Sequence, residues 1–113
     1  MGIPSAGTVV LVRFPFSDLS NSKLRPAVVL ADAGRNDLVL CQITSQPYTD
    51  PIAVEILNPD LLTGSFRKTS YARSGKLFTA NSAIVTKQIG KLNAQKHEQI
   101  VAANVALLQT NVL

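Results

Sequence analysis

Side chains that bind metals or act as nucleophiles are scarce in this chain of 113 residues, which has one histidine and one cysteine. A single histidine excludes nucleases that depend on a pair of histidines. The seven acidic residues are scattered, and they form no HExxH or DxD motif, so the sequence indicates no metal site. The glycine-rich signatures of nucleotide-binding loops are absent too. We therefore expect neither a metal nor a cofactor.

Long hydrophobic runs are also missing. No apolar stretch approaches the roughly 18 residues that cross a bilayer, and the N-terminus lacks the pattern of a secretion signal. Hydrophobic residues nevertheless make up 46% of the chain, which indicates a folded domain, and we interpret residues 1–113 as one domain. Cys41 lies in the apolar segment LVLCQI, where we expect a small buried hydrophobic side chain rather than a nucleophile. These features favour a cytoplasmic protein that does not associate with membranes.

Acidic residues are outnumbered by basic ones, and the formal net charge is +4. This charge is compatible with a nucleic-acid partner but does not establish one. Each basic side chain is either a solvated surface charge or, if several share a face, part of a phosphate-binding surface. The basic residues in or beside predicted loops and strand ends are Arg13, Lys23, Arg25, Arg35, Arg67, Lys68, Arg73 and Lys76.

Short apolar segments separated by turn-forming residues predict a series of β-strands. Pro26 is expected at the first position of its strand or on a sheet edge, which places Arg25 at the mouth of that strand. Residues 17–23 are rich in turn formers and predict a loop, and residues 33–37 predict a hairpin turn. The predicted strands cover residues 7–14, 26–32, 38–44, 52–57, 70–79 and 83–90.

The hydrophobic period changes after Asn93, which we predict to be the N-cap of a helix. Val101, Val105, Leu108 and Val112 are predicted to form its apolar face. His97 fits a half-exposed position on this helix better than a catalytic one. Short strands followed by one helix predict a mainly β (α+β) fold, a small and strongly curved antiparallel barrel with a C-terminal α-helix.

One reaction needs neither a metal nor a protein nucleophile: cleavage of RNA by its own 2′-hydroxyl group. The protein must orient the RNA and stabilise the charge that develops on the phosphate. An arginine fork and a hydroxyl donor suit this task. A candidate site of this kind combines Arg25 at its strand mouth with Thr44 and Ser45. These two residues lie at the end of the strand that is predicted to pair with the strand of Arg25. Alternatively, Arg25 is a solvated cation and Thr44 an ordinary strand-end residue.

The segments GTVVLVRFPFSD, KLRPAVVL, LVLCQITSQ, SYARSGKLFT and IGKL, in this order, resemble the MazF/PemK family of toxin–antitoxin ribonucleases. The combination of RPAVVL with ITSQ is the most specific part. The resemblance implies an SH3-like barrel, a homodimer and sequence-specific, metal-independent cleavage of single-stranded RNA, with mRNA as the expected substrate, in the bacterial cytoplasm. It also implies a cognate MazE/PemI-like antitoxin whose tail covers the RNA-binding groove.

By this resemblance Arg25 and Thr44 match the catalytic arginine and threonine of the family. Ser45 and Gln46 are expected to hold RNA. Phe16 is expected either to stack on a base or to pack, whereas Phe14 is expected to pack in the core. The remaining candidates for RNA contacts are Lys23, Arg67, Lys68 and Arg73.

Two positions depart from the family pattern. Ser20 stands where some relatives carry a glutamate, which removes support for a loop carboxylate as general acid or base. Ser70 stands where many relatives carry an acidic residue, which leaves Arg73 as the polar residue of that segment, on RNA or in the dimer interface. Two alternatives remain open: a toxin of the same fold that acts by binding a protein, as gyrase poisons do, and an inactive family member.

Overall fold

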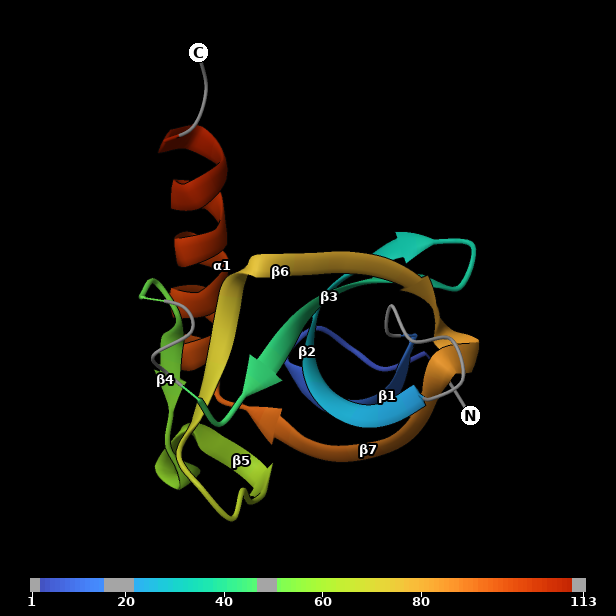
Figure 1. The fold of residues 1–113 in the computed structure, drawn as a ribbon, viewed down its shortest axis with the longest axis horizontal. Coiled ribbons are helices and arrows are strands. Elements are labelled where there is room, and N and C mark those ends of the chain that lie inside the picture. The colour runs from blue at the N-terminus through green and yellow to red at the C-terminus, as the bar shows by residue number, and fades with distance from the viewer. Residues whose placement is uncertain (1–2, 16–21, 47–50, 111–113) are drawn as a thin grey trace.

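The computed structural model describes residues 3–15, 22–46 and 51–110, with the backbone alone for residues 14, 15, 22 and 23. These residues form a seven-stranded sheet that curls into half a barrel, with an α-helix beside it (Figure 1). The sheet has the order β4-β6-β3-β2-β1-β7-β5, and all its strand pairs are antiparallel. The predicted mainly β barrel with a C-terminal helix is confirmed. The elements are β1 (Thr8–Pro15), β2 (Ser22–Gly34), β3 (Asp37–Thr44), β4 (Val54–Ile56), the 3-10 turn η2 (Asn58–Asp60), β5 (Leu61–Gly64), β6 (Ser70–Asn81), the 3-10 turn η3 (Ser82–Ile84), β7 (Val85–Leu92) and α1 (Ala94–Thr110).

Strand β2 begins earlier than the sequence predicts, at Ser22 rather than at Pro26. Arg25 is therefore not at the mouth of the strand but inside it, opposite Val12 of β1. Pro26 is tolerated there because β2 pairs with β3 only from Ala27 onward. At Pro26 the strand has β1 as its ladder neighbour, so the missing N–H removes no bond toward β3.

The predicted hairpin turn at residues 33–37 is confirmed between β2 and β3. Arg35 and Asn36 both have positive φ, 55° and 64°. Two successive residues with positive φ are typical of the type I′ turn, whose twist matches that of the flanking strands. The backbone N–H of Ser82 donates to the carbonyl oxygen of Asn36 over 2.7 Å, which fastens the turn to the end of β6.

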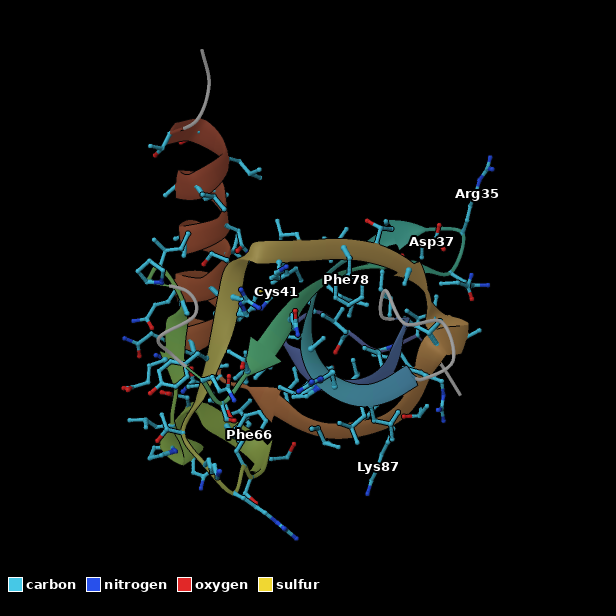
Figure 2. The ribbon with its side chains drawn as sticks, viewed as in Figure 1. Arg35, Asp37, Cys41, Phe66, Phe78 and Lys87 are labelled. Atoms are coloured by element: carbon cyan, nitrogen blue, oxygen red, sulfur yellow. The ribbon has the colours of Figure 1, made fainter. Side chains whose placement is uncertain are left out.

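The two faces of the curled sheet carry separate hydrophobic clusters. The inner cluster consists of Val10, Val12, Ala27, Val29, Leu38 and Leu40, with Phe78, Ala80, Ile84 and Val85 packed against it. Phe78 points into the curl from β6, so this face is its inside (Figure 2). The outer cluster consists of Val9, Val28, Cys41, Ile43, Ile56, Ala72, Leu92 and Ile100. Cys41 is fully buried in it, as predicted.

Helix α1 begins as predicted, because the Asn93 side chain accepts a hydrogen bond from the backbone N–H of Lys96 over 2.8 Å. The face that packs on the sheet is not the predicted apolar face, however. The helix buries Ile100 and Asn104 against β4 and β6, whereas Val105 and Leu108 are 43% and 61% exposed. Val112 lies outside the described residues. No helix within the described ranges is long and apolar enough to cross a membrane.

The segment between β3 and β6 is the part the sequence predicts least well. The strand predicted at 52–57 is only the three-residue β4, and the short strand β5 was not expected. The turn η2 between them is held by reciprocal bonds, from Leu57 N–H to Asp60 Oδ2 (2.8 Å) and from Asp60 N–H to the Leu57 carbonyl (2.9 Å). Lys96 of α1 lies 3.6 Å from the same carboxylate and connects this segment to the helix.

Candidate active site

The strand registers bring the two predicted catalytic residues together. The ladder between β2 and β3 ends at Ala27, which lies opposite Gln42. Arg25 and Thr44 each lie two residues beyond this last pair, on adjacent strands. Thr44 in turn lies opposite Tyr71 of β6. Arg25, Thr44 and Tyr71 thus form a transverse row across the three neighbouring strands β2, β3 and β6. At the paired residues Thr44 and Tyr71 the two backbones are about 4.7–4.9 Å apart.

All three side chains of the transverse row lie on the inner face of the sheet. Successive side chains of a strand point to opposite faces. Arg25 shares its face with Ala27 of the inner cluster, whereas Ile43 and Ala72, next to Thr44 and Tyr71, belong to the outer cluster. The row therefore lies at the end of the inner cluster, with Val12 beside Arg25.

The hydroxyl group of Thr44 is oriented by the backbone. Its Oγ1 accepts a hydrogen bond from the Gln46 N–H over 3.1 Å, in a short turn that closes β3. Because this oxygen is occupied as an acceptor, the hydroxyl proton points elsewhere and is available for donation. Thr44 is half-buried. This geometry suits a fixed donor to an anionic oxygen.

Arg73 joins the site from β6. The ladder between β3 and β6 is interrupted between Ile43–Ala72 and Cys41–Leu77, so β6 has extra residues and bends at Arg73–Lys76 (Figure 1). The carbonyl oxygen of Arg73 accepts a hydrogen bond from the Cys41 thiol over 3.1 Å, which holds this bend. By alternation, Arg73 shares the inner face with Tyr71.

Arg25 and Arg73 are similar in their surroundings. Both side chains are half-buried, and the Nε atom of each is shielded from solvent. Arg25 lies on β2 and Arg73 on β6, the two strands that neighbour β3. A guanidinium remains protonated at all physiological pH values. Two cations and a hydroxyl donor on neighbouring strands are groups that can bind a phosphate.

The other predicted RNA-binding residues are more peripheral. Ser45 and Gln46 are exposed directly after β3. Arg67 and Lys68 are exposed just before β6, and they line a groove of about 360 Å³ together with Leu57, Asn58, Pro59, Phe66 and Thr69. The Asn58 side chain fixes this loop, accepting from the Phe66 N–H (2.9 Å) and donating to the Phe66 carbonyl (3.3 Å). Phe16 and the side chains of Lys23 and Phe14 lie outside what the structure describes, as does Ser20.

Sequence reasoning missed Gln42 and Tyr71, which share the inner face with Arg25 and Thr44. No motif identifies them. The signal that finds them is the strand register, since Tyr71 is selected by its position opposite Thr44 and not by its sequence neighbours. Ser70 is buried, and its hydroxyl donates to the Lys68 carbonyl over 3.1 Å, so it packs at the start of β6.

His97 lies on the first turns of α1, away from the transverse row. Burial lowers its pKa below the ordinary value of 6.5, the nearby Lys91 ammonium lowers this pKa further, and Glu98 partly opposes the shift. Its ring packs beside Gly7, where an added Cβ would lie 3.8 Å from Nδ1. Across the described ranges, no group of three or more His, Cys, Asp or Glu side chains is placed to hold a metal ion.

One family model matches most of the chain. Residues 5–108 match the model of the PemK-like, MazF-like toxin of type II toxin–antitoxin systems. No curated protein sequence matches the chain.

Several solved structures share the fold. A MazE–MazF complex from Deinococcus radiodurans has a TM-score of 0.76 and 18% identity, covering 96% of this chain and 98% of that chain. An endoribonuclease from Mycobacterial species has a TM-score of 0.72 and 20% identity, covering 100% and 98%. The Mycobacterium tuberculosis toxin MazF-mt6 has a TM-score of 0.70 and 15% identity, covering 90% and 96%.

Proposed function

Because the chain belongs to the family of PemK-like, MazF-like toxins of type II toxin–antitoxin systems, we propose that it cleaves single-stranded RNA as an endoribonuclease. The observation that supports this most is that Arg25, Thr44 and Arg73 lie on the neighbouring strands β2, β3 and β6, near the end of β3. Three donors on neighbouring strands suit a phosphate whose charge increases during the reaction.

In the proposed reaction the 2′-oxygen attacks the adjacent phosphorus. A bond forms between the 2′-oxygen and phosphorus, and the bond from phosphorus to the 5′-oxygen breaks. The 2′-hydroxyl loses a proton and the 5′-oxygen gains one, which leaves a 2′,3′-cyclic phosphate and a 5′-hydroxyl end. Since the substrate carries its own nucleophile, the reaction requires no metal ion.

Each residue has a separate task. Arg25 binds two phosphate oxygens through its planar fork, and the strand on either side of it holds that fork in place. Thr44 donates its free hydroxyl proton to a third oxygen. Arg73 adds charge from the opposite side. Ser45, Gln46, Arg67 and Lys68 bind the RNA chain beyond the cut, together with Lys23 and Phe16.

The proposed partners follow from charge and exposed apolar surface. A basic groove that binds RNA also fits the extended acidic tail of a cognate MazE/PemI-like antitoxin, which orders on binding. The exposed apolar side chains of α1 support a homodimer. We propose that the protein acts in the bacterial cytoplasm and that mRNA is its substrate.

Substitution of Arg25 and Thr44 tests the proposal. Removal of one stabilising donor typically lowers a rate by ~10²–10³, so Arg25→Ala should lose most cleavage of a single-stranded RNA while its circular dichroism is unchanged. Arg25→Lys should also fail, because a point charge does not replace a fork. Thr44→Ala should be impaired, and less severely than Arg25→Ala.

Arg35→Ala is the matched control. Arg35 belongs to the same hairpin but points into solvent at its far end (Figure 2). Its loss should leave cleavage unchanged. Full activity of Arg25→Ala would overturn the proposed site. A wild type that cleaves no RNA but still binds a protein target would favour the alternative of a toxin that acts by protein contact.

A further inference from the structure

The transverse row continues past Tyr71 to a carboxylate. Tyr71 lies opposite Thr44 on one side and opposite Glu55 of β4 on the other. Two strand spacings of about 4.7–4.9 Å therefore separate the backbones of Thr44 and Glu55, with the tyrosine between them. The extended row therefore contains, in order, a cation, a hydroxyl group, an aromatic ring and an anion. These groups belong to Arg25, Thr44, Tyr71 and Glu55.

The direction of the Glu55 side chain follows from its neighbours. Ile56 is fully buried in the outer cluster and Val54 packs against that cluster. Because side chains alternate along a strand, Glu55 points to the opposite face, the same face as Tyr71. Glu55 is exposed and Tyr71 is half-buried, so both can contact a ligand that lies along the row.

An aromatic ring beside a carboxylate is suited to reading a base. In single-stranded RNA, bases stack on aromatic side chains and are recognised by hydrogen bonds to their Watson–Crick edges. An ionised carboxylate only accepts hydrogen bonds. Guanine presents two adjacent donors on that edge, N1–H and the 2-amino group, which match the two carboxylate oxygens. The Watson–Crick edges of adenine, cytosine and uracil offer a carboxylate no such pair.

We propose that Tyr71 and Glu55 form a subsite that selects a guanine next to the cleaved phosphate. The inference rests on the proposed function, since it assumes a phosphate at Arg25 and Thr44. Tyr71 stacks on the base, and Glu55 accepts from N1–H and the 2-amino group. The row thus fixes both the bond that is cut and the base beside it.

The position of Glu55 argues against a role as general base. The 2′-oxygen is attached to the sugar next to the phosphate that Thr44 binds, whereas Glu55 is two strands away. A general base must come within about 2.6–3.2 Å of the proton it removes. Glu55 is therefore a specificity residue.

The test measures binding rather than cleavage, so that it does not depend on activity. The probes are fluorescently labelled 2′-O-methyl pentanucleotides in which two uridines flank each side of guanine, inosine, adenine or cytosine. Inosine lacks only the 2-amino group. The wild type should bind the guanine probe about tenfold more tightly than the inosine probe, the effect of one charge-assisted hydrogen bond at a partly exposed site.

Glu55→Gln should bring the guanine-to-inosine ratio close to one, while the affinity for the cytosine probe is retained, which shows that the variant folds. Glu98→Gln, an exposed position on α1, is the matched control and should keep the wild-type ratio. Tyr71→Leu should weaken binding of all four probes.

Equal wild-type affinity for the four probes, or a guanine preference that persists in Glu55→Gln, would overturn the subsite. In that case cleavage that depends on Arg25 would still support the proposed reaction. A guanine preference lost in Glu55→Gln, without cleavage of unmodified RNA, would support the subsite and contradict the reaction.

Discussion

Among single residues, His97 gives the protein a pH-dependent stability. Its pKa is lowered in the folded state, so the unfolded chain binds a proton more readily than the folded one. This contribution to the unfolding free energy is fully present above 6.5, the ordinary value, and is lost as the pH falls through the lower folded pKa. Urea unfolding at about pH 7.5 and about pH 5.5 should therefore show a loss of stability on acidification.

His97→Gln isolates this effect. The variant lacks the titrating group, so its stability should change less between the two pH values. The decrease in the wild type should be reduced when Lys91 is replaced by glutamine, because the ammonium group is one cause of the lowered pKa. An unchanged pH dependence in His97→Gln would assign the effect to other groups.

The sequence predicted several individual residues for physical reasons that hold in the structure. Asn93 caps α1 because its side chain satisfies a backbone N–H. Cys41 is buried because a small apolar side chain fits between strands. Tyr71 and Glu55 were not predicted, since their place beside Thr44 depends on pairings between β3, β6 and β4. Such long-range registers have no signature in a local sequence pattern.

At the level of elements, helix α1 shows that hydrophobic periodicity alone does not identify the buried face of a helix. Val101, Val105 and Leu108 do lie along one stripe, but β4 and β6 pack against the adjacent stripe that contains Ile100 and Asn104. The C-terminal turns of α1 extend beyond the sheet (Figure 1). A hydrophobic pattern indicates that one face of a helix will be buried. Which strands or helices pack against that face depends on the tertiary structure.

Asn104 is the residue of α1 that we expect to lower the stability of the fold. It is 4% exposed, and neither Nδ2 nor Oδ1 has a hydrogen-bond partner among the described residues. A buried polar group without a partner typically costs about 1–3 kcal/mol. Asn104→Leu should therefore raise the unfolding free energy by about 1–2 kcal/mol in urea titrations.

Gln99→Leu provides the control, since it adds the same side chain at an exposed position of α1. Its stability should remain close to that of the wild type. A destabilised Asn104→Leu variant would mean that the buried amide contributes favourable interactions.

The β2 strand shows a second limit of sequence reasoning. The sequence places Pro26 at the first position of its strand or on a sheet edge, and we expected the strand to start there. In the structure the strand starts earlier, and Pro26 lies where β2 has β1 as a neighbour but is not yet paired with β3, since that pairing begins at Ala27. Arg25 thus lies inside the strand, where it pairs with Val12 of β1.

For the whole molecule, the exposed apolar surface predicts self-association. Helix α1 carries no charged residue after Glu98. Val105 and Leu108 are exposed, and the helix borders an apolar groove lined by Ile52, Ala103, Ala106, Leu107 and Thr110. Contiguous apolar surface of this kind is typical of an interface. We expect light scattering at micromolar concentration to give about twice the chain mass of 12.1 kDa.

Leu108→Lys should shift that mass toward the monomer, because it places a charge on the exposed side of α1. Glu98→Lys, near the start of the helix, should leave the mass unchanged. A monomeric wild type would remove the homodimer and any groove shared between two copies.

The central claim is that the RNA supplies the nucleophile and that Arg25, Thr44 and Arg73 stabilise the phosphate. The most direct measurement is cleavage, in EDTA, of an RNA oligonucleotide and of the same oligonucleotide with a single 2′-deoxy substitution at the cut site. We predict that the RNA is cut to products with 2′,3′-cyclic phosphate and 5′-hydroxyl ends, and that the 2′-deoxy substrate remains intact. Cleavage of the 2′-deoxy substrate at the same bond, or products with 5′-phosphate ends, would contradict it.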